Sequence, residues 1–361
     1  MQVRLHRSLL TYAGLTVHTA SSGPVEGLDT LLLELDDGTY RAIGEVRINC
    51  AYLNGYEPDY LLAVTKKAID DLDWDRSPSA LRSIIAEGDW PAPVRMLLDI
   101  ALWDLSAKRC GAPLAHLLGT QALPIAHATN QTLFLSDDAA FDAKVARYVE
   151  RGFRELKLRV GQDIAADCAR AGRIRAAHGS DVTLAADANG AWSADEAPAR
   201  LAALAAYNLA YVEQPIAAGD FDAMATLAGN APMPLMLDES LASLDDVDAL
   251  ATRGPQSNLQ GHLKLIKLGG LTPALAAADK LAKAGIPFMI GQMNEGTVAT
   301  AAALHLAVAT RPLHAELYGA DGLVNDPAEG LTYADGQVSV AAGPGLGLNF
   351  RAPSAPLSLG E

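Results

Sequence analysis

The sequence has few cysteines, fewer basic than acidic residues, and no long apolar run. Its three cysteines, Cys50, Cys110 and Cys168, are odd in number and form no C-x-x-C pair, which argues against a disulfide framework and a zinc knuckle. With 28 Lys and Arg against 43 Asp and Glu, the formal net charge is −15 at pH 7. Nucleic acid is therefore not an expected partner, because a phosphate backbone needs a basic face.

No stretch approaches the roughly 18 uninterrupted apolar residues of a membrane span. The opening MQVRLHRSLLTYAG also lacks the apolar core of a signal peptide. We therefore expect a cytoplasmic protein with neither a membrane nor a nucleic-acid partner. At 361 residues, half of them hydrophobic, the chain is long enough for one large or two ordinary domains.

Charged residues recur where apolar runs end. AADANGAW places Asp187 after such a run, LAYVEQP places Glu213, and MPLMLDES places Asp238. HLKLIKLGG then places Lys264 and Lys267 in the next apolar strand. A single Asp after a strand is most often a turn former or a helix cap, but the spacing of 25 to 26 residues, with one helical segment in each gap, indicates a repeated strand–loop–helix unit.

The chain divides into three parts by pattern. Residues 1–55 read as strands, with a hairpin at Asp37-Gly38, and residues 59–84 and 93–118 have apolar positions at helical spacing. Between 122 and 320, seven or eight strand–helix units predict a parallel (β/α) barrel. The carboxyl ends of barrel strands meet at one mouth, so the three carboxylates are expected to converge there on a hard divalent cation such as Mg²⁺.

The ordered motifs ELKLRVG, DAN, VEQP, LDES, LKLIKLGGL and GQMNEG resemble the enolase superfamily, in particular its muconate-lactonizing and mandelate-racemase-like members. DIALWDLSAKRCGAPLAHLLG and PGLGLNF resemble the segments that join that family's capping domain to its barrel. The resemblance implies an α+β capping domain over 1–121, a modified TIM barrel, (β/α)7-8, over 122–320, and a C-terminal segment, 321–361, that returns to the cap. It also implies a homo-oligomer.

The same resemblance implies roles for individual residues. Asp187, Glu213 and Asp238 would bind one Mg²⁺, or Mn²⁺, and Asn189 and Glu239 would orient these ligands. Lys264 would be the base on the sixth strand, Lys267 a structural charge, and Glu295 in GQMNEG a group near the substrate. Tyr52, Asn54 and Tyr56 in NCAYLNGYEPDY would line the substrate pocket, or would pack on the barrel rim.

One departure from the family pattern concerns the second barrel strand, where many relatives have Lys-x-Lys and use the second lysine as a base. This chain has Lys157-Leu158-Arg159. A guanidinium is a poor general base, so Arg159 would clamp a substrate carboxylate or hydroxyl, or act as a positive neighbour of Lys264. Lys157 would at most take over some of the proton transfer. Like-charge repulsion from these cations and the metal would lower the pKa of Lys264.

With a single base, the resemblance favours a dehydratase that removes the proton α to a carboxylate and eliminates water from a hydroxyproline-like imino acid or a sugar acid. The imino acid is preferred because the site strands lack the His/Asp pair that many sugar-acid enzymes of the family have. His262 and His305 match no site position. The alternatives are a racemase or epimerase of an amino- or imino-acid derivative, a cycloisomerase, and a non-catalytic metal- or ligand-binding homologue.

Overall fold

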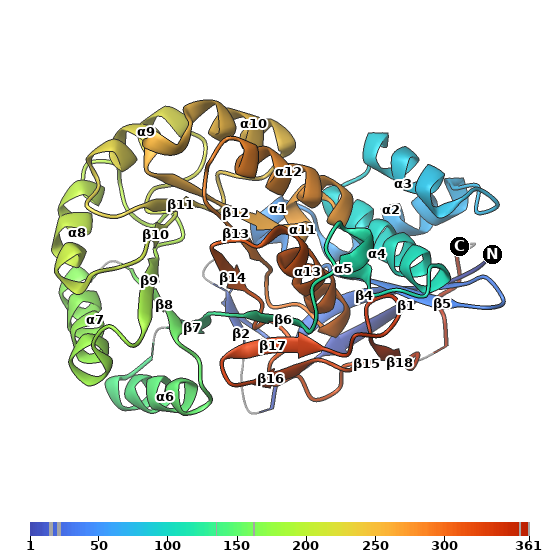
Figure 1. Cartoon of the computed structure of the whole chain (residues 1–361), viewed down its shortest axis with the longest axis horizontal. Helices are drawn as coiled ribbons and strands as arrows, with labels where there is room; N and C mark the ends of the chain where they lie inside the picture. The colour runs from blue at the N-terminus through green and yellow to red at the C-terminus, as the bar shows by residue number, and fades with distance from the viewer. Residues whose placement is uncertain (14–16, 20–22, 135, 162, 354, 360–361) are drawn as a thin grey trace.

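The computed structural model describes residues 1–13, 17–19, 23–134, 136–161, 163–353 and 355–359. Figure 1 shows a barrel ringed by helices on the left and a strand-and-helix cap on the right, with both chain ends on the cap side. The predicted architecture, a (β/α) barrel with an α+β cap, is confirmed. Among the described residues, no helix combines the length and apolar character needed to cross a membrane.

The cap contains an antiparallel sheet in the order β1-β4-β5 and a short β2-β3 pair. The predicted hairpin joins β4 to β5, and the Asp37 carboxylate accepts hydrogen bonds from the backbone N–H groups of Thr39 at 2.9 Å and Tyr40 at 2.7 Å. The strand bounds are β1 (Gln2–Leu10), β2 (Val17–Thr19), β3 (Gly23–Val25), β4 (Leu28–Asp36) and β5 (Arg41–Arg47).

Helices complete the cap and pack on this sheet. The predicted helical stretch over 59–84 is two helices rather than one, because Pro78 can begin a helix but cannot continue one. The next stretch is similarly divided by a turn at Cys110–Pro113. The helix bounds are α1 (Ala51–Asn54), α2 (Pro58–Asp71), α3 (Pro78–Glu87), α4 (Ala92–Arg109) and α5 (Leu114–Leu117).

Eight parallel strands form the barrel in sequence order from β7 to β14. A hydrogen bond of 2.9 Å from Asn130 N–H to the Ala315 carbonyl lies between the first and last strands and nearly closes the ring. The strand bounds are β7 (Gln131–Leu133), β8 (Glu155–Arg159), β9 (Thr183–Asp187), β10 (Val212–Glu213), β11 (Leu235–Leu237), β12 (Leu259–Lys264), β13 (Phe288–Gly291) and β14 (His314–Glu316).

Helices alternate with these strands, and several begin at a side chain that accepts a hydrogen bond from the first turn. Asp137, Asp163 and Asp220 cap α6, α7 and α9 in this way, and Ser243 forms a capping box with Asp246 at α10. The helix bounds are α6 (Asp138–Glu150), α7 (Ile164–His178), α8 (Ala197–Leu204), α9 (Phe221–Asn230), α10 (Leu244–Arg253), α11 (Leu265–Leu268), α12 (Leu271–Lys283) and α13 (Thr297–Thr310).

Two expectations about the strands are wrong. The strand predicted from IAHATNQTLF is divided: β6 (Ile125–Ala128) pairs antiparallel with β17 outside the barrel, and only β7 belongs to the barrel. Lys267 does not continue the sixth strand, because β12 ends at Lys264 and Leu265–Leu268 form a helical turn, α11. The apolar run thus covers a strand and a turn that are both buried.

The C-terminal segment lies between the barrel and the cap (Figure 1). Its strands are β15 (Ala328–Glu329), β16 (Thr332–Ala334), β17 (Gln337–Val340) and β18 (Asn349–Phe350). It touches the cap where Leu346 N–H donates to the buried Asp104 at 2.9 Å and Leu357 N–H donates to the Leu5 carbonyl at 2.7 Å. The domain boundaries at 121/122 and 320/321 remain predictions.

Candidate active site

The charged residues singled out in the sequence come together at the carboxyl ends of neighbouring barrel strands. The strand register pairs Arg159 with Asp187, and Asp187 with Glu213, so these three residues lie at one level of the barrel. Lys264 pairs with Gly291, and Gly291 with Glu316, on the other side. Convergence at one mouth is what a parallel barrel imposes on strand ends.

Cations and carboxylates alternate around this mouth. Lys157 Nζ lies 2.8 Å from Glu213 Oε2 and 3.4 Å from Asp187 Oδ2, and it also pairs with Glu316. Arg159 Nη1 donates to Asp187 Oδ2 at 2.9 Å.

Asp238 has two cationic partners of its own. Lys264 Nζ lies 2.7 Å from its Oδ2 and Lys267 Nζ 2.6 Å from its Oδ1. Lys267 is therefore a buried partner of a predicted metal ligand, which agrees with a structural role for its charge.

Burial and mutual repulsion perturb the acids. Burial, reinforced by Asp187 and Asp238, raises the pKa of Glu213 to about 7. Burial likewise raises the pKa of Glu239 to about 7, with Asp238 and Asp187 adding to the rise. At Asp187 burial acts in the same direction, but Arg159 and Lys157 outweigh it and bring the pKa to about 2. The raised pKa values show that the lysine and arginine side chains at the mouth do not fully offset the repulsion between its carboxylates.

The donor set suits a divalent cation. The buried atoms Asn189 Oδ1 and Glu239 Oε2 have no hydrogen-bond partner among the residues that the structure describes. Asn189 also orients its neighbours, because its N–H donates to Asp187 Oδ1 at 3.0 Å and its Nδ2 donates to Glu239 Oε1 at 3.2 Å. Oxygen atoms left without donors beside three carboxylates are what a hard cation such as Mg²⁺ would satisfy.

The tightest metal-sized group among the described residues differs from the predicted trio. It contains Glu213, Asp238 and His262, whose ligand atoms lie within 4.8 Å of one another, whereas Asp187 is engaged by Arg159 and Lys157. The ligand set Asp187, Glu213 and Asp238 therefore remains a prediction. The structure adds a histidine to its surroundings.

Sequence reasoning set His262 aside because it matched no site position, but the structure places it at the mouth. Its Nδ1 lies 2.8 Å from Glu213 Oε1, its buried Nε2 has no hydrogen-bond partner among the described residues, and a Cβ at Gly291 would come within 1.9 Å of Nε2. The available signal was spacing, because a residue two positions before Lys264 in a strand faces the same side of the barrel.

Two further contributors were not singled out. Glu316 ends β14, where it accepts a hydrogen bond from Asn130 Nδ2 at 3.1 Å besides pairing with Lys157. Gln214, next to Glu213, accepts hydrogen bonds through Oε1 from the N–H groups of Asp238 and Ser240, both at 3.1 Å. Glu316 repeats the strand-end pattern and could have been found. Gln214 could not, because its role depends on a neighbouring loop.

The pKa expected for Lys264 is wrong for this arrangement of charges. Burial lowers it, but the carboxylates of Asp238, Glu316 and Glu213 outweigh burial and the repulsion from Lys157, and they raise the pKa above its ordinary value. The expectation of a lowered pKa counted the cations and omitted the nearer carboxylates. Arg159 behaves as expected, because Asp187 holds it firmly protonated, with a pKa above its ordinary value despite burial.

Glu295 lies in the loop after β13, where it is buried. Its Oε2 accepts a hydrogen bond from Met293 N–H at 3.2 Å, and its Oε1 has no partner. Burial raises its pKa to about 7, although Arg47 and Lys264 oppose this shift. Its proximity to the Lys264 charge is consistent with the predicted place near the substrate.

The three predicted substrate-binding residues separate in the structure. Tyr52 is close enough to Arg47 and Lys264 for both cations to counter the rise that burial causes in its pKa. Asn54 and Tyr56 instead line a groove of about 790 Å³ between the cap and the barrel, which Lys267 borders but Lys264 does not. They therefore line a groove that does not include Lys264.

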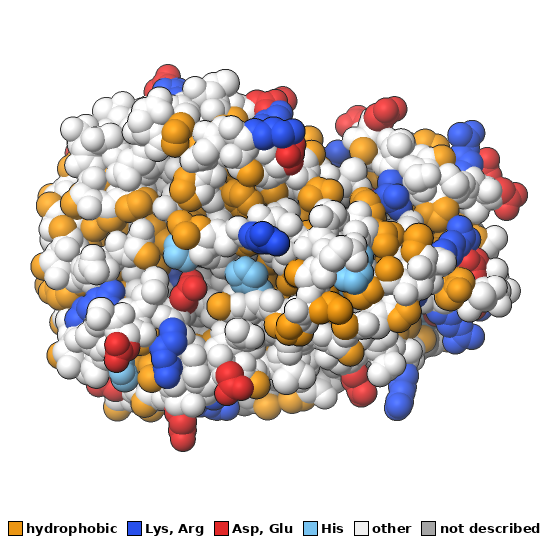
Figure 2. Space-filling view, viewed as in Figure 1, with side chains coloured by type: hydrophobic (Ala, Val, Ile, Leu, Met, Phe, Trp, Pro, Cys, Tyr) orange, Lys and Arg blue, Asp and Glu red, His pale blue; other side chains and the backbone are white. Residues whose placement is uncertain are grey.

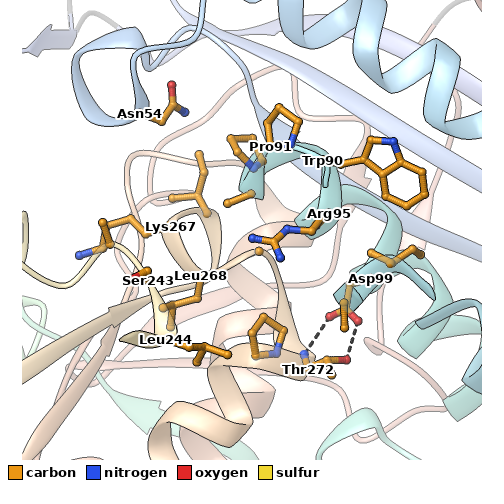
Figure 3. A pocket seen from close by; sticks show the side chains of 18 of the residues that line it. Asn54, Trp90, Pro91, Arg95, Asp99, Ser243, Leu244, Lys267, Leu268 and Thr272 are labelled. Carbon is orange, nitrogen blue, oxygen red and sulfur yellow. Dashed lines mark hydrogen bonds between the residues drawn. The ribbon is translucent and has the colours of Figure 1, made fainter. Parts of the chain in front are cut away.

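Figure 3 shows this groove, with Arg95 and Trp90 from the cap facing Leu268 and Thr272 of the barrel. Asp99 accepts hydrogen bonds there from Thr272 N–H at 2.9 Å and Thr272 Oγ1 at 2.6 Å. In Figure 2 the outline of the molecule is indented between α3 and the barrel helices, and the charged side chains on that face are scattered rather than gathered in one patch.

Comparisons with known proteins agree with this geometry. Residues 140–354 match the family model described as Enolase C-terminal domain-like. The chain is 34% identical over 255 residues to a hydrophobic dipeptide epimerase of Enterococcus faecalis, covering 70% of this chain and 71% of that protein. It is 31% identical to an N-succinyl-L-Arg/Lys racemase of Bacillus cereus, covering 58% of this chain and 56% of that protein.

A solved structure shares the whole architecture. The dipeptide epimerase from Enterococcus faecalis, crystallised with Mg and the dipeptide L-Leu-L-Tyr, superposes with a TM-score of 0.87 at 28% identity and covers 96% of this chain and 98% of that chain.

Proposed function

Because this chain belongs to the enolase superfamily, we propose that it is a Mg²⁺-dependent enzyme that removes the proton α to a carboxylate and returns it to give a racemised or epimerised amino-acid derivative. Its membership of that superfamily makes it an isomerase or lyase that uses a metal. The single observation that carries the proposal is the convergence of Asp187, Glu213 and Asp238 on one mouth opposite Lys264.

Magnesium is the cofactor of this site. The solved relative from Enterococcus faecalis contains Mg, and the crowded carboxylates with unpartnered oxygens nearby fit a hard dication. We propose Asp187, Glu213 and Asp238 as its ligands, with Asn189, Glu239 and Gln214 orienting them. When bound, the ion stabilises the second negative charge that develops on the substrate carboxylate as the α-proton leaves.

Lys264 is the base in this proposal. It lies buried at the end of the sixth strand, across the mouth from β8, and must be neutral to accept a proton. Its contact with Asp238 favours the charged form, so deprotonation requires that Asp238 be engaged elsewhere. The proposed ligand role of Asp238 meets this requirement.

Isomerisation needs a proton donor on the opposite face of the α-carbon. The cations of β8 are Lys157 and Arg159, and both are held by carboxylates. We assign this face to Lys157, because Arg159 remains protonated beside Asp187 and serves to hold and orient that ligand. The epimerase and racemase names of the relatives support isomerisation over the dehydration favoured by the sequence.

Dehydration is kept as a second candidate because of Arg159. If no group on β8 can return a proton, the carbanion formed by Lys264 would decay by loss of a β-hydroxyl group instead. The predicted hydroxyproline-like and sugar-acid substrates belong to this candidate. Cycloisomerisation is supported by the name of one relative, a muconate cycloisomerase of Pseudomonas putida that is 31% identical over 264 residues. A purely binding role has no specific observation in its favour.

Deuterium exchange separates these candidates. A library of N-acyl amino acids, dipeptides and hydroxy acids is incubated with enzyme and Mg²⁺ in D₂O, and NMR follows the α-proton and the products. An isomerase should exchange the α-proton and interconvert stereoisomers, a dehydratase should release a keto acid, and a binder should do neither. Lys264→Ala should abolish exchange of the enantiomer whose α-proton faces Lys264, whereas continued exchange of that enantiomer would refute the assigned base.

The assembly and surroundings of the enzyme remain predictions. We propose a small-molecule carboxylate as the substrate and a homo-oligomer as the working form, to be checked by light scattering at micromolar concentration. A monomer there would contradict the oligomer without affecting the catalytic proposal.

A further inference from the structure

A second cavity, of about 370 Å³, lies beside the barrel mouth between α6, the segment after β14 and the first residues of the cap. Phe134, directly after β7, and Tyr318, two residues after the end of β14, form part of its wall. Helix α6 contributes Lys144, Arg147 and Arg151 to the same cavity.

The cavity shares its inner wall with the charged mouth. The Phe134 ring is near two cations, with the guanidinium carbon of Arg159 5.9 Å from the ring centroid and Lys144 Nζ 5.6 Å from it. Tyr318 is close enough to Lys157 and Arg159 for both to oppose the rise that burial causes in its pKa. Phe134 and Tyr318 thus connect the two sites, and the outer end of an extended substrate bound at the mouth would reach the cavity by passing them.

The cavity carries an excess of positive charge. Arg151 is balanced by Asp321, which it contacts through two hydrogen bonds of 2.8 and 2.9 Å. Among the described residues, Lys144 and Arg147 have no carboxylate within 4.0 Å, and Lys144 contacts only aromatic rings, those of Phe134 and Tyr148. Burial lowers the pKa of Lys144, and the charge of Arg147 lowers it further.

In the part of the chain that the structure describes, the carboxylates nearest these cations are already engaged by other side chains. Asp321 is engaged by Arg151, and Glu316, the nearest strand-end carboxylate, is engaged by Lys157 and Asn130. Lys144 and Arg147 are three residues apart on α6 and so share one helix face, where an anion could contact both. A cationic group would meet repulsion there with no compensating carboxylate.

We infer that this cavity receives a second anionic group of the substrate, a carboxylate distal to the one that reacts, and that Lys144 and Arg147 select it. The inference rests on the proposed function for the position of the reacting carboxylate. It specifies the substrate class as an N-acyl amino acid or dipeptide whose outer group is negatively charged.

Matched substrate pairs test the charge selection. N-succinyl-L-alanine is compared with its terminal amide, and N-acetylglutamate with N-acetylglutamine, so that either end of the substrate can reach the cavity. In α-proton exchange with Mg²⁺, kcat/KM for the acid should exceed that for the amide by about tenfold in at least one pair, mainly through KM. The double variant Lys144→Gln, Arg147→Gln should reduce this preference to about twofold or less.

Lys283→Gln serves as the control, because it removes one positive charge on α12 outside the cavity. It should keep the wild-type preference. Equal rates for acid and amide in both pairs, or an unchanged preference in the double variant, would overturn the inference while leaving exchange and the proposed function intact.

Binding without turnover separates the two proposals. Affinities of the same four compounds for the Mg²⁺-loaded enzyme are measured by calorimetry. If no compound exchanges its α-proton but the acids bind about tenfold more tightly, and the double variant loses that difference, the cavity assignment stands and the proposed function fails. Equal affinities of acid and amide in both pairs would refute the cavity assignment.

Discussion

Two groups of buried carboxylates in this protein, one at the contact between cap and barrel and one at the mouth, have different partners. At the contact between cap and barrel, Glu45 accepts hydrogen bonds from the backbone N–H groups of Gly296 at 2.6 Å, Val298 at 2.9 Å and Ala299 at 3.2 Å. At the mouth, Asp187, Glu213 and Asp238 are paired with lysine and arginine side chains instead.

Asp104 follows the pattern of the contact region. Its Oδ2 accepts from Ile43 N–H at 2.9 Å and its Oδ1 from Leu346 N–H at 2.9 Å, so that one side chain joins β5, α4 and the C-terminal segment. A Cβ at Gly345 would come within 2.2 Å of Oδ1, so that position must lack a side chain. Because these backbone donors cannot rearrange, the Asp104 carboxylate has a structural role.

The two regions differ in whether the hydrogen-bond donors around their carboxylates can move. Lysine side chains at the mouth can move when charge is added or removed there, whereas the N–H groups around Glu45 and Asp104 cannot. We therefore expect changes at the mouth to alter activity with little loss of stability, and changes at the contact region to do the reverse.

The largest effect is expected from a change at the mouth. Glu213→Gln keeps the shape of the side chain but removes a charge, and should lower turnover by about a thousandfold or more, because transition-state stabilisation by the ion is worth several kcal/mol. Mg²⁺ should raise the melting temperature of the wild type but not of the variant. Full activity of the variant would exclude Glu213 as a ligand.

A change in the contact region should do the opposite. Asp104→Ala leaves the N–H groups of Ile43 and Leu346 without an acceptor and Lys108 without its ion pair, so the free energy of unfolding should fall by about 3–5 kcal/mol. Urea denaturation measures this loss. At temperatures where the variant is folded, its Mg²⁺ affinity should equal that of the wild type, and a weakened affinity would contradict the separation of the two regions.

The contact region should also respond to pH through His305. Its Nδ1 accepts from Ala115 N–H at 3.1 Å, its Nε2 donates to the Leu346 carbonyl at 3.3 Å, and burial lowers its pKa to about 4. The unfolded histidine titrates near 6.5, so the neutral form stabilises the fold above that pH. This contribution, about 3 kcal/mol, should be lost as the pH falls from 6.5 to 4.

His305→Gln tests this pH dependence, because glutamine offers one acceptor and one donor without titrating in this range. The difference in unfolding free energy between wild type and variant should change by about 3 kcal/mol as the pH falls from 6.5 to 4. A difference that stays constant between pH 7.5 and 4 would show that His305 has the same pKa in the folded and the unfolded chain, and would contradict the expected shift.

The smallest effect is expected where a mouth residue is exchanged within its charge type. Arg159→Lys retains a cation beside Asp187 but supplies a group that can transfer protons. We expect exchange from the β8 face to rise by about tenfold, less than the roughly 10²–10⁴ that a well-positioned acid–base group provides. Comparing exchange rates of the two enantiomers measures it. An unchanged ratio would contradict the expected contribution of a lysine at position 159 and leave Lys157 as the group that serves that face.

How far the sequence predicted this protein can be judged from particular residues. Asp187, Glu213, Asp238 and Lys264 stand at the ends of successive apolar runs, and parallel strands must bring their ends together, so the barrel and the mouth followed from spacing. Spacing could not predict that β12 ends at Lys264, because α11 is as apolar and buried as the strand before it.

The sequence by itself determined the order of the strands, the hairpin at Asp37-Gly38 and the charges that meet at the mouth, because periodicity and turn chemistry are local properties. The tertiary structure decided which charges pair. It set His262 against Glu213, surrounded Lys264 with carboxylates, turned Asn54 and Tyr56 toward another groove, and left Lys144 and Arg147 without carboxylate partners among the described residues. Electrostatic energy depends on distance and burial, and neither can be read from the position of a residue along the chain.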